Sequence, residues 1–151
     1  MLQVGNAGLS PIEARSHFGA WAVVAAPLLI AADVVSGLDA DTLAVLTAPE
    51  VVAVNQDPAG VQGVRVSPSN PGGSECWARP LADGGVAALL LNRALATADV
   101  TCTFEQLGLK DPSNSAKARD LWARSDLGVF STAFTAKAVP GHGSMLVKFT
   151  Q

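Results

Sequence analysis

The chain has 151 residues, of which 49% are hydrophobic and 15% charged, and its formal net charge is −3. This composition excludes a disordered chain and is typical of a folded protein that buries a sizeable core. Residues 1–57 hold six acidic side chains against one basic side chain, Arg15, whereas residues 58–151 hold nine basic and seven acidic ones. Because neither part has a basic stripe, we expect no nucleic-acid partner.

The apolar runs are too short for a membrane-spanning chain. The longest, Phe18 to Ala32, falls short of the ~20 residues that a spanning helix needs, and Pro27 interrupts it. We therefore expect no membrane partner. The first residues also lack a basic segment followed by an apolar one, so we expect no export signal within this sequence.

The first part of the chain has the pattern of an α/β protein. Residues 10–13, Ser-Pro-Ile-Glu, form a capping box, which predicts a helix that starts there and ends near Ala26, just before a proline. The apolar run Leu28–Ala31 predicts a short strand buried on both faces. Asp39 predicts the N-cap of a second helix. The run Val51–Val54 fits either a helix or a strand.

After Pro58, short β-type runs alternate with clusters of turn residues. We expect strands at Val61–Val66, Ser74–Arg79, Val86–Asn92, Val100–Phe104, Arg119–Ala123, Val129–Thr135 and Ser144–Thr150. In the last of them Met145, Val147 and Phe149 share one face, which we expect to be core. Strands at this spacing predict an antiparallel sandwich.

Longer motifs resemble a known family over essentially the whole chain. Two stretches resemble the end of the catalytic barrel of glycoside hydrolase family 27, and these are MLQVGNAGLSPIEARSHFGAWAVVAAPLLIAADV and LTAPEVVAVNQDPAGVQG. Three segments are similar to its C-terminal β region, and these are CWARPLADGGVAALLLNR, DLWARSDLG and VPGHGSMLVKF. The family contains α-galactosidases and α-N-acetylgalactosaminidases. The resemblance implies the C-terminal end of a (β/α)8 TIM barrel in residues 1–57 and an antiparallel β-sandwich in residues 58–151.

The family motif at the start reads Trp-Asn-Asp-Pro-Asp-Met-Leu, of which this chain supplies Met1-Leu2. The resemblance implies a retaining enzyme that hydrolyses terminal α-galactosides with two aspartates, both upstream of Met1. We therefore expect no catalytic residue in this chain, and we interpret it as a C-terminal fragment that is inactive by itself and tends to aggregate. The parent enzyme, which would bind the galactoside substrate, is expected to be secreted.

Two other interpretations remain open. In the first, residues 58–151 form a stand-alone β-sandwich that binds carbohydrate or a protein partner without catalysis. In the second, the chain is the non-catalytic half of a split glycosidase, and a separate barrel fragment completes it.

Few residues qualify as site candidates. The resemblance makes Met1 a substrate-binding residue, because it corresponds to a methionine that lines the sugar site of the family. Asp33 follows the predicted strand Leu28–Ala31, where a barrel places active-site groups. The family has an aspartate there that is not catalytic, which favours a structural or supporting role for Asp33.

The other polar and aromatic candidates favour structural roles. His17 and His142 fit packing and turn positions, and residues 55–58, Asn-Gln-Asp-Pro, fit the satisfaction of backbone groups at a link between two regions. Trp77 and Trp122 lie on predicted strands, where large aromatic side chains favour the core over sugar binding.

The two cysteines, Cys76 and Cys102, both lie on predicted strands of the β region. They fit either a disulfide or two buried thiols, since the sequence does not fix their distance. No cysteine–histidine cluster has zinc spacing, and no glycine-rich loop follows a strand, so we expect no metal and no cofactor.

Overall fold

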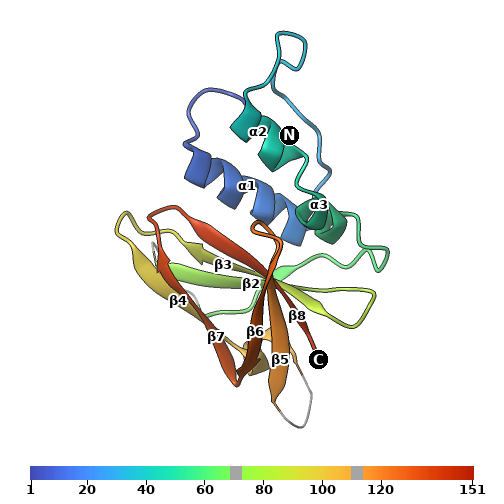
Figure 1. Ribbon diagram of the computed structural model, residues 1–151, viewed down its shortest axis with the longest axis vertical. Helices are drawn as coiled ribbons and strands as arrows, with labels where there is room; N and C mark the ends of the chain where they lie inside the picture. Colours follow the sequence, from blue (N-terminus) through green and yellow to red (C-terminus); the bar gives the residue numbers. More distant parts are fainter. Residues whose placement is uncertain (69–72, 110–113) are drawn as a thin grey trace.

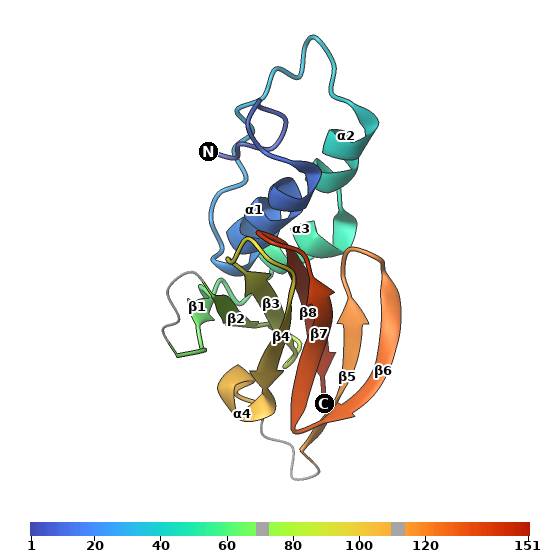
Figure 2. The ribbon, with the colours of Figure 1, turned by 90° about the vertical axis from the view of Figure 1, so that its left-hand side faces the viewer.

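The computed structural model describes residues 1–68, 73–109 and 114–151. The helices of these residues are α1 (Pro11–Val23), α2 (Ala40–Leu46), α3 (Pro49–Asn55) and the short α4 (Phe104–Leu107). The strands are β1 (Val64–Arg65), β2 (Ser74–Pro80), β3 (Val86–Asn92), β4 (Ala98–Thr103), β5 (Ser115–Asp120), β6 (Ser125–Ser131), β7 (Ala133–Val139) and β8 (Ser144–Thr150). Helices α1, α2 and α3 gather at one end of the molecule, against the strands (Figures 1 and 2).

The described strands form two packed sheets. One has the order β1-β2-β3-β8-β5-β6, and the other consists of β4 and β7. Every strand pair is antiparallel, with Leu89 of β3 opposite Trp77 of β2 and Leu146 of β8. The second half of the chain is therefore an antiparallel β-sandwich, as predicted.

Central strand β3 separates two cores, because successive side chains of a strand point to opposite faces. Val86, Ala88 and Leu90 point into a core between the two sheets, which we call the inter-sheet core. Ala87 and Leu89 point the other way, into a helix–sheet core under α1. The result is three layers, in which the larger sheet lies between the helices and the smaller sheet.

The last strand, β8, also contributes side chains to both cores. Val147 and Phe149 are buried in the inter-sheet core and Met145 packs against it, which confirms the predicted core face. Leu146 on the opposite face is equally buried, because it faces the helix–sheet core. Strand alternation alone could not reveal that α1 covers this second face.

The helix starts follow their predicted caps. The Ser10 side chain accepts from the Glu13 N–H and the Glu13 side chain accepts from the Ser10 N–H, so the predicted capping box starts α1. Helix α1 ends at Val23, close to the predicted end, and Ala25 then adopts a left-handed conformation with φ of 56°. Asp39 caps α2 as predicted, and the ambiguous run at 51–54 lies within helix α3.

The predicted strand Leu28–Ala31 is wrong as a regular strand. The segment makes one isolated parallel bridge, between Ile30 and Leu2. Leu29 is 59% exposed and Ile30 is 45% exposed, so neither is buried on both faces. A doubly buried strand needs neighbours on both sides, and among the described residues only the Leu2 segment pairs with it.

The predicted strands Ser74–Arg79, Val86–Asn92 and Ser144–Thr150 are confirmed to within a residue. The prediction for Val61–Val66 was too long, because only Val64 and Arg65 pair with β2. The prediction for Val100–Phe104 runs one residue too far, because Phe104 begins α4 behind a capping box of Thr103 and Gln106.

Two other predicted strands have the wrong bounds. Strand β5 ends at Asp120, whose carboxylate accepts from the Trp122 and Ala123 N–H groups, so Arg119–Ala123 is largely a turn. The predicted strand Val129–Thr135 is two strands, because Thr132 between β6 and β7 has a φ of 65° and breaks the extended run. In both cases a turn without glycine or proline interrupted a β-type sequence.

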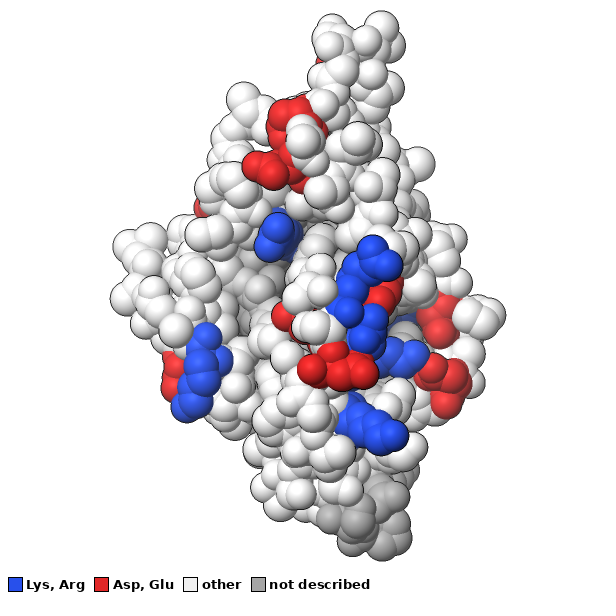
Figure 3. Space-filling view, in the orientation of Figure 1, with Lys and Arg blue, Asp and Glu red and all other residues white. Residues whose placement is uncertain are grey.

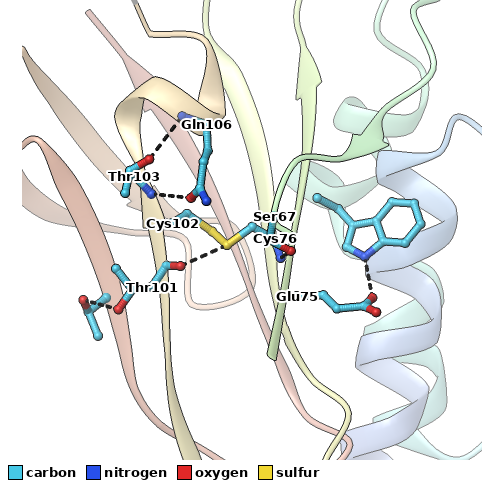
Figure 4. Close-up of a disulfide and its surroundings, with 9 residues drawn as sticks. Ser67, Glu75, Cys76, Thr101, Cys102, Thr103 and Gln106 are labelled. Carbon is cyan, nitrogen blue, oxygen red and sulfur yellow. Dashed lines mark hydrogen bonds between the residues drawn. A yellow bond between two sulfur atoms is a disulfide. The ribbon is translucent and has the colours of Figure 1, made fainter. Parts of the chain in front are cut away.

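A disulfide joins Cys76 of β2 to Cys102 of β4, which resolves the two alternatives for these cysteines. Both residues are buried, and the bond crosses the inter-sheet core from one sheet to the other (Figure 4). The Cys76 N–H donates to Ser67 Oγ at 3.0 Å, which fixes the backbone beside the bond.

One buried arginine fastens the helices to the larger sheet. Arg79 of β2 is 1% exposed, and its Nη1 donates to Ala22 O at 2.9 Å and to Asn55 O at 3.2 Å. These oxygens belong to the last turns of α1 and α3, where a helix lacks internal donors and carries partial negative charge. The cation thus caps two helices from the sheet.

Gly63 completes this junction by a close backbone approach. Its N–H donates to Val23 O at 2.9 Å, and a Cβ atom at this position would lie 2.4 Å from the same oxygen. A side chain there would push the chain away from the end of α1.

Substitution Arg79→Met should lower the free energy of unfolding by about 2 kcal/mol, because two buried carbonyls lose their donor. Urea unfolding measures this loss. As a matched control, Lys137→Met removes an exposed cation whose pair with Asp99 is at the surface, so it should cost less than about 1 kcal/mol. Equal losses for the two variants would contradict the capping role.

Removal of the disulfide should lower the free energy of unfolding by about 3 kcal/mol, because the unfolded chain regains the freedom of the loop that the bond closed. The sequence separation of Cys76 and Cys102 is 26 residues. Urea unfolding of the double variant Cys76→Ser/Cys102→Ser checks this value. A reductant should destabilise the original protein and leave the double variant unchanged, and the same response in both would refute the prediction.

Candidate functional site

The parallel bridge between Leu2 and Ile30 defines the candidate site. The Leu2 N–H donates to Leu29 O at 2.8 Å, and helix α1 connects the two bridged segments. Segment–helix–segment with parallel segments is the βαβ arrangement, in which both carboxyl ends lie at the same edge. We call this edge the bridge edge; Gln3, Asn6, Ala31 and Asp33 lie at or beyond it, whereas Met1 directly precedes the bridged Leu2. Groups that act on ligands lie at such edges in α/β folds.

Met1, directly before the bridged Leu2, has 67% of its surface exposed, so its side chain is free to contact a ligand. Asp33 lies on the second segment, and its carboxylate forms a turn. It accepts from the Val35 N–H at 2.9 Å, the Ser36 N–H at 3.1 Å and the Ser36 hydroxyl at 2.7 Å. The bonds from Ser36 and Val35 lower the pKa of Asp33. The carboxylate is thus hydrogen-bonded within its own loop, which agrees with the structural role predicted for Asp33.

His17 reaches the bridge edge from α1. Its Nε2 accepts from the Gln3 N–H at 3.1 Å, and its ring lies on Trp21 with 4.2 Å between the ring centres. Burial, and next the positive charge of the chain's amino group, lower the pKa of His17. The packing role predicted for this residue is confirmed, and the bond to Gln3 is an addition that helix spacing alone did not reveal.

A cleft of about 480 Å³ lies beside the bridge edge, between α1, α2 and the loop at residues 5–9. Its walls combine apolar Leu9, Ile12 and Val45 with charged side chains that include Arg15 and Asp41. This volume is within the range of small-molecule sites. Sequence reasoning missed the cleft because its walls come from three separate segments, none of which has a motif of its own.

Residues 55–58 lie at the junction between the helices and the sandwich. The Asn55 side chain donates to Ala26 O at 2.8 Å and to Trp21 O at 3.3 Å. The Asp57 carboxylate accepts from the Ala82 N–H at 3.0 Å. The segment therefore satisfies backbone groups between the two regions, as predicted.

His142 lies at the same junction, in the turn between β7 and β8. Its Nδ1 contacts Glu13 Oε1 at 3.1 Å, and its carbonyl oxygen accepts from the Ser16 hydroxyl at 2.8 Å. The Ser10 N–H and hydroxyl, followed by His142, lower the pKa of Glu13 to about 2. His142 thus joins the sandwich to the first turn of α1, which confirms its structural role.

Both tryptophans pack against the helices. Trp77 donates from Nε1 to Glu75 Oε2 at 3.0 Å and packs against the helix–sheet core (Figure 4 draws Glu75 beside α1). Trp122 lies 6.2 Å from Phe18 between ring centres, with the Arg15 guanidinium 5.8 Å from its ring. These contacts confirm the preference for packing over sugar binding.

Charged side chains are intermingled on the face shown in Figure 3, and basic and acidic groups lie next to each other near β5 and β6. Arg119 accounts for part of this pattern, since it donates to Glu50 of α3 and to Asp126 of β6. In the described ranges, no three histidine, cysteine or acidic side chains cluster as a metal site would require. No helix among the described residues is long and apolar enough to cross a membrane.

Comparison with known proteins defines the class. The family model described as "Alpha galactosidase C-terminal beta sandwich domain" matches residues 71–149, and the model "Alpha galactosidase A" matches residues 1–57. The α-galactosidase of Coffea arabica is 44% identical over 151 residues, covering 99% of this chain and 38% of its own length. A probable α-galactosidase of Dictyostelium discoideum is 37% identical, covering 99% and 39%.

A solved structure agrees with these matches. The structure of α-galactosidase I from Mortierella vinacea has a TM-score of 0.90 and 33% sequence identity, and covers 100% of this chain and 38% of that protein. The fold is thus that of the C-terminal part of this structure, including its β-sandwich. The chain belongs to the α-galactosidases of glycoside hydrolase family 27, as the sequence motifs predicted, and matches their C-terminal portion. It spans about two fifths of the length of the relatives named above.

Acid titration tests the hydrogen bonds that Glu13 accepts from Ser10, together with its contact with His142. A carboxyl group whose pKa is lowered from 4.5 to about 2 stabilises the fold above its ordinary pKa, and this contribution is lost as the pH falls through 2. Between pH 4.5 and 2, the thermal midpoint should therefore fall less steeply for Glu13→Gln than for the original protein. Glu105→Gln removes an exposed carboxylate elsewhere and should retain the steep fall. Parallel curves for Glu13→Gln and the original protein would show that these contacts do not lower the pKa of Glu13.

Proposed function

We propose that this chain forms the C-terminal portion of a retaining α-galactosidase-like glycoside hydrolase that cleaves terminal α-galactosides. In this proposal residues 1–57 are the last strand–helix units of a (β/α)8 barrel, and residues 58–151 are its C-terminal sandwich. The observation that carries the proposal is the parallel Leu2–Ile30 bridge with α1 as its crossover, since parallel segments joined by a helix are the repeating unit of such a barrel.

The chain by itself is inactive in this proposal. A retaining glycosidase needs a nucleophile and an acid/base carboxyl about 5–5.5 Å apart. The family resemblance assigns both aspartates to earlier barrel strands, upstream of Met1. Asp33 is no substitute, because its carboxylate is bonded to Val35 and Ser36.

Met1 contributes to sugar binding within the complete site. Its exposed position directly before the bridged Leu2 supports this role, as does its match to the family's sugar-lining methionine. The full enzyme is secreted in this proposal, and the disulfide between Cys76 and Cys102 supports that location, because such bonds persist in oxidising compartments.

A split enzyme is the second candidate. The second bridged segment and the loop after it expose Leu29, Ile30, Val34 and Val35, and Val35 is 93% exposed. A barrel fragment could cover these side chains equally well whether it is a separate chain or covalently joined to this one. A stand-alone sugar-binding sandwich has less support, because Trp77 and Trp122 pack against the helices.

A fusion tests the proposed function. The part of the Coffea arabica α-galactosidase that precedes its match is joined directly to Met1, which restores the full length of the relative. We expect the fusion to release the aryl alcohol from an aryl α-galactoside, and the 151-residue chain to release none.

Two results would contradict this proposal. Activity of the 151-residue chain alone would refute the assignment of catalysis to upstream residues. A fusion that folds but cleaves no α-galactoside would refute the α-galactosidase function itself. Circular dichroism and the thermal midpoint establish that each protein is folded before its activity is compared.

A further inference from the structure

His17 occupies an unusual position among the described residues of α1. It extends from the helix to the backbone of the bridged segment, where its Nε2 accepts from the Gln3 N–H at 3.1 Å. The preceding residue, Leu2, donates its own N–H to Leu29 O at 2.8 Å. A side chain thus accepts the N–H that directly follows the bridge.

This bond ends the first segment at the bridge edge. A continuing strand would present the Gln3 N–H to a neighbouring strand. His17 accepts it instead, and the chain turns, with Asn6 N–H donating to Gln3 O at 3.0 Å and Gly5 at a φ of 91°. The Asn6 side chain also donates to Gln3 Oε1 at 3.1 Å. Gln3 is therefore bonded at its N–H, its carbonyl and its side chain.

The His17 ring is held in place for this bond. It lies on Trp21 with ring centres 4.2 Å apart and is half-buried. Glu13, one turn earlier, is bonded to Ser10 and His142 and not to His17. The charged group that acts on the ring is the amino group of Met1.

We propose that His17 is a positioning residue, whose neutral Nε2 fixes Gln3 and, through the bridged Leu2, holds Met1 in the sugar site. This inference rests on the proposed function, because it requires that Met1 contacts substrate. A protonated imidazole has two N–H donors and no acceptor. Acid therefore breaks the bond to Gln3.

The fusion with the Coffea arabica segment tests this role, because Met1 is then an internal residue and can be replaced. His17→Leu removes the acceptor and should raise KM for an aryl α-galactoside about two- to tenfold, the value of one net hydrogen bond, with kcat nearly unchanged. His17→Gln offers a carboxamide oxygen as acceptor and should keep KM near its original value.

Two further comparisons separate positioning from a general structural effect. If His17 acts through Met1, the double variant Met1→Ala/His17→Leu should have the KM of Met1→Ala alone. As the pH falls below the ordinary pKa of histidine, KM of the original fusion should rise. The His17→Gln variant should lack this dependence of KM on pH. The control His142→Gln removes the other histidine of the chain and should keep the dependence of KM on pH.

The outcomes distinguish this inference from the proposed function. If the fusion is active but His17→Gln does not keep KM near its original value, the inference is overturned and the proposed function stays intact. The same holds if the increases in KM caused by Met1→Ala and His17→Leu multiply in the double variant. A folded but inactive fusion overturns the proposed function and the substrate-positioning role with it.

The hydrogen bond itself can be measured without activity. Hydrogen exchange at the Gln3 amide of the fusion should be protected at neutral pH in the original protein and in His17→Gln. Protection should be lost in His17→Leu. Equal protection in all three proteins would show that His17 does not hold this N–H and would overturn the inference.

Discussion

The buried guanidinium of Arg79 is the interaction on which the arrangement of this chain depends. A charge buried to this extent is costly unless its donors are satisfied. The Nη1 of Arg79 donates to the terminal carbonyls of α1 and α3, whose partial negative charges replace a carboxylate, while its Nε is buried without a hydrogen-bond partner among the described residues. Two helices and a strand must therefore meet at one point, and Gly63 provides the space for this contact. The sandwich is consequently a support for the helices rather than an independent appendage.

This constraint extends to the candidate site through α1. Arg79 holds the last turn of the helix, Ser16 and Glu13 bind the turn at His142, and His17 holds Gln3 at the bridge edge. The sheet thus sets the position of α1, and α1 sets the position of the segment that carries Met1. In an α-galactosidase-like enzyme, such a path would let a sandwich without catalytic groups contribute to the geometry of a sugar site.

The sequence predicted those features that depend on local chemistry. The capping box of Ser10 and Glu13, the Asp39 cap and three strands were predicted correctly, because each is decided within a few residues. Leu28–Ala31 failed because its apolar side chains predict burial, and burial depends on neighbours that the described chain does not supply. Thr132 and the turn after Asp120 were missed because neither contains glycine or proline. The roles of Arg79 and His17 depend on contacts between distant segments, which no local pattern contains.

Native-state hydrogen exchange tests most directly whether the helices and the sandwich form one cooperative unit. If the Arg79 junction couples them, amides in the middle of α1 and of β3 should open with the same free energy, and both values should fall together as urea is added. Opening of α1 at a much lower free energy than β3 would contradict the account, because the helices would then be a separate layer that the sandwich does not hold.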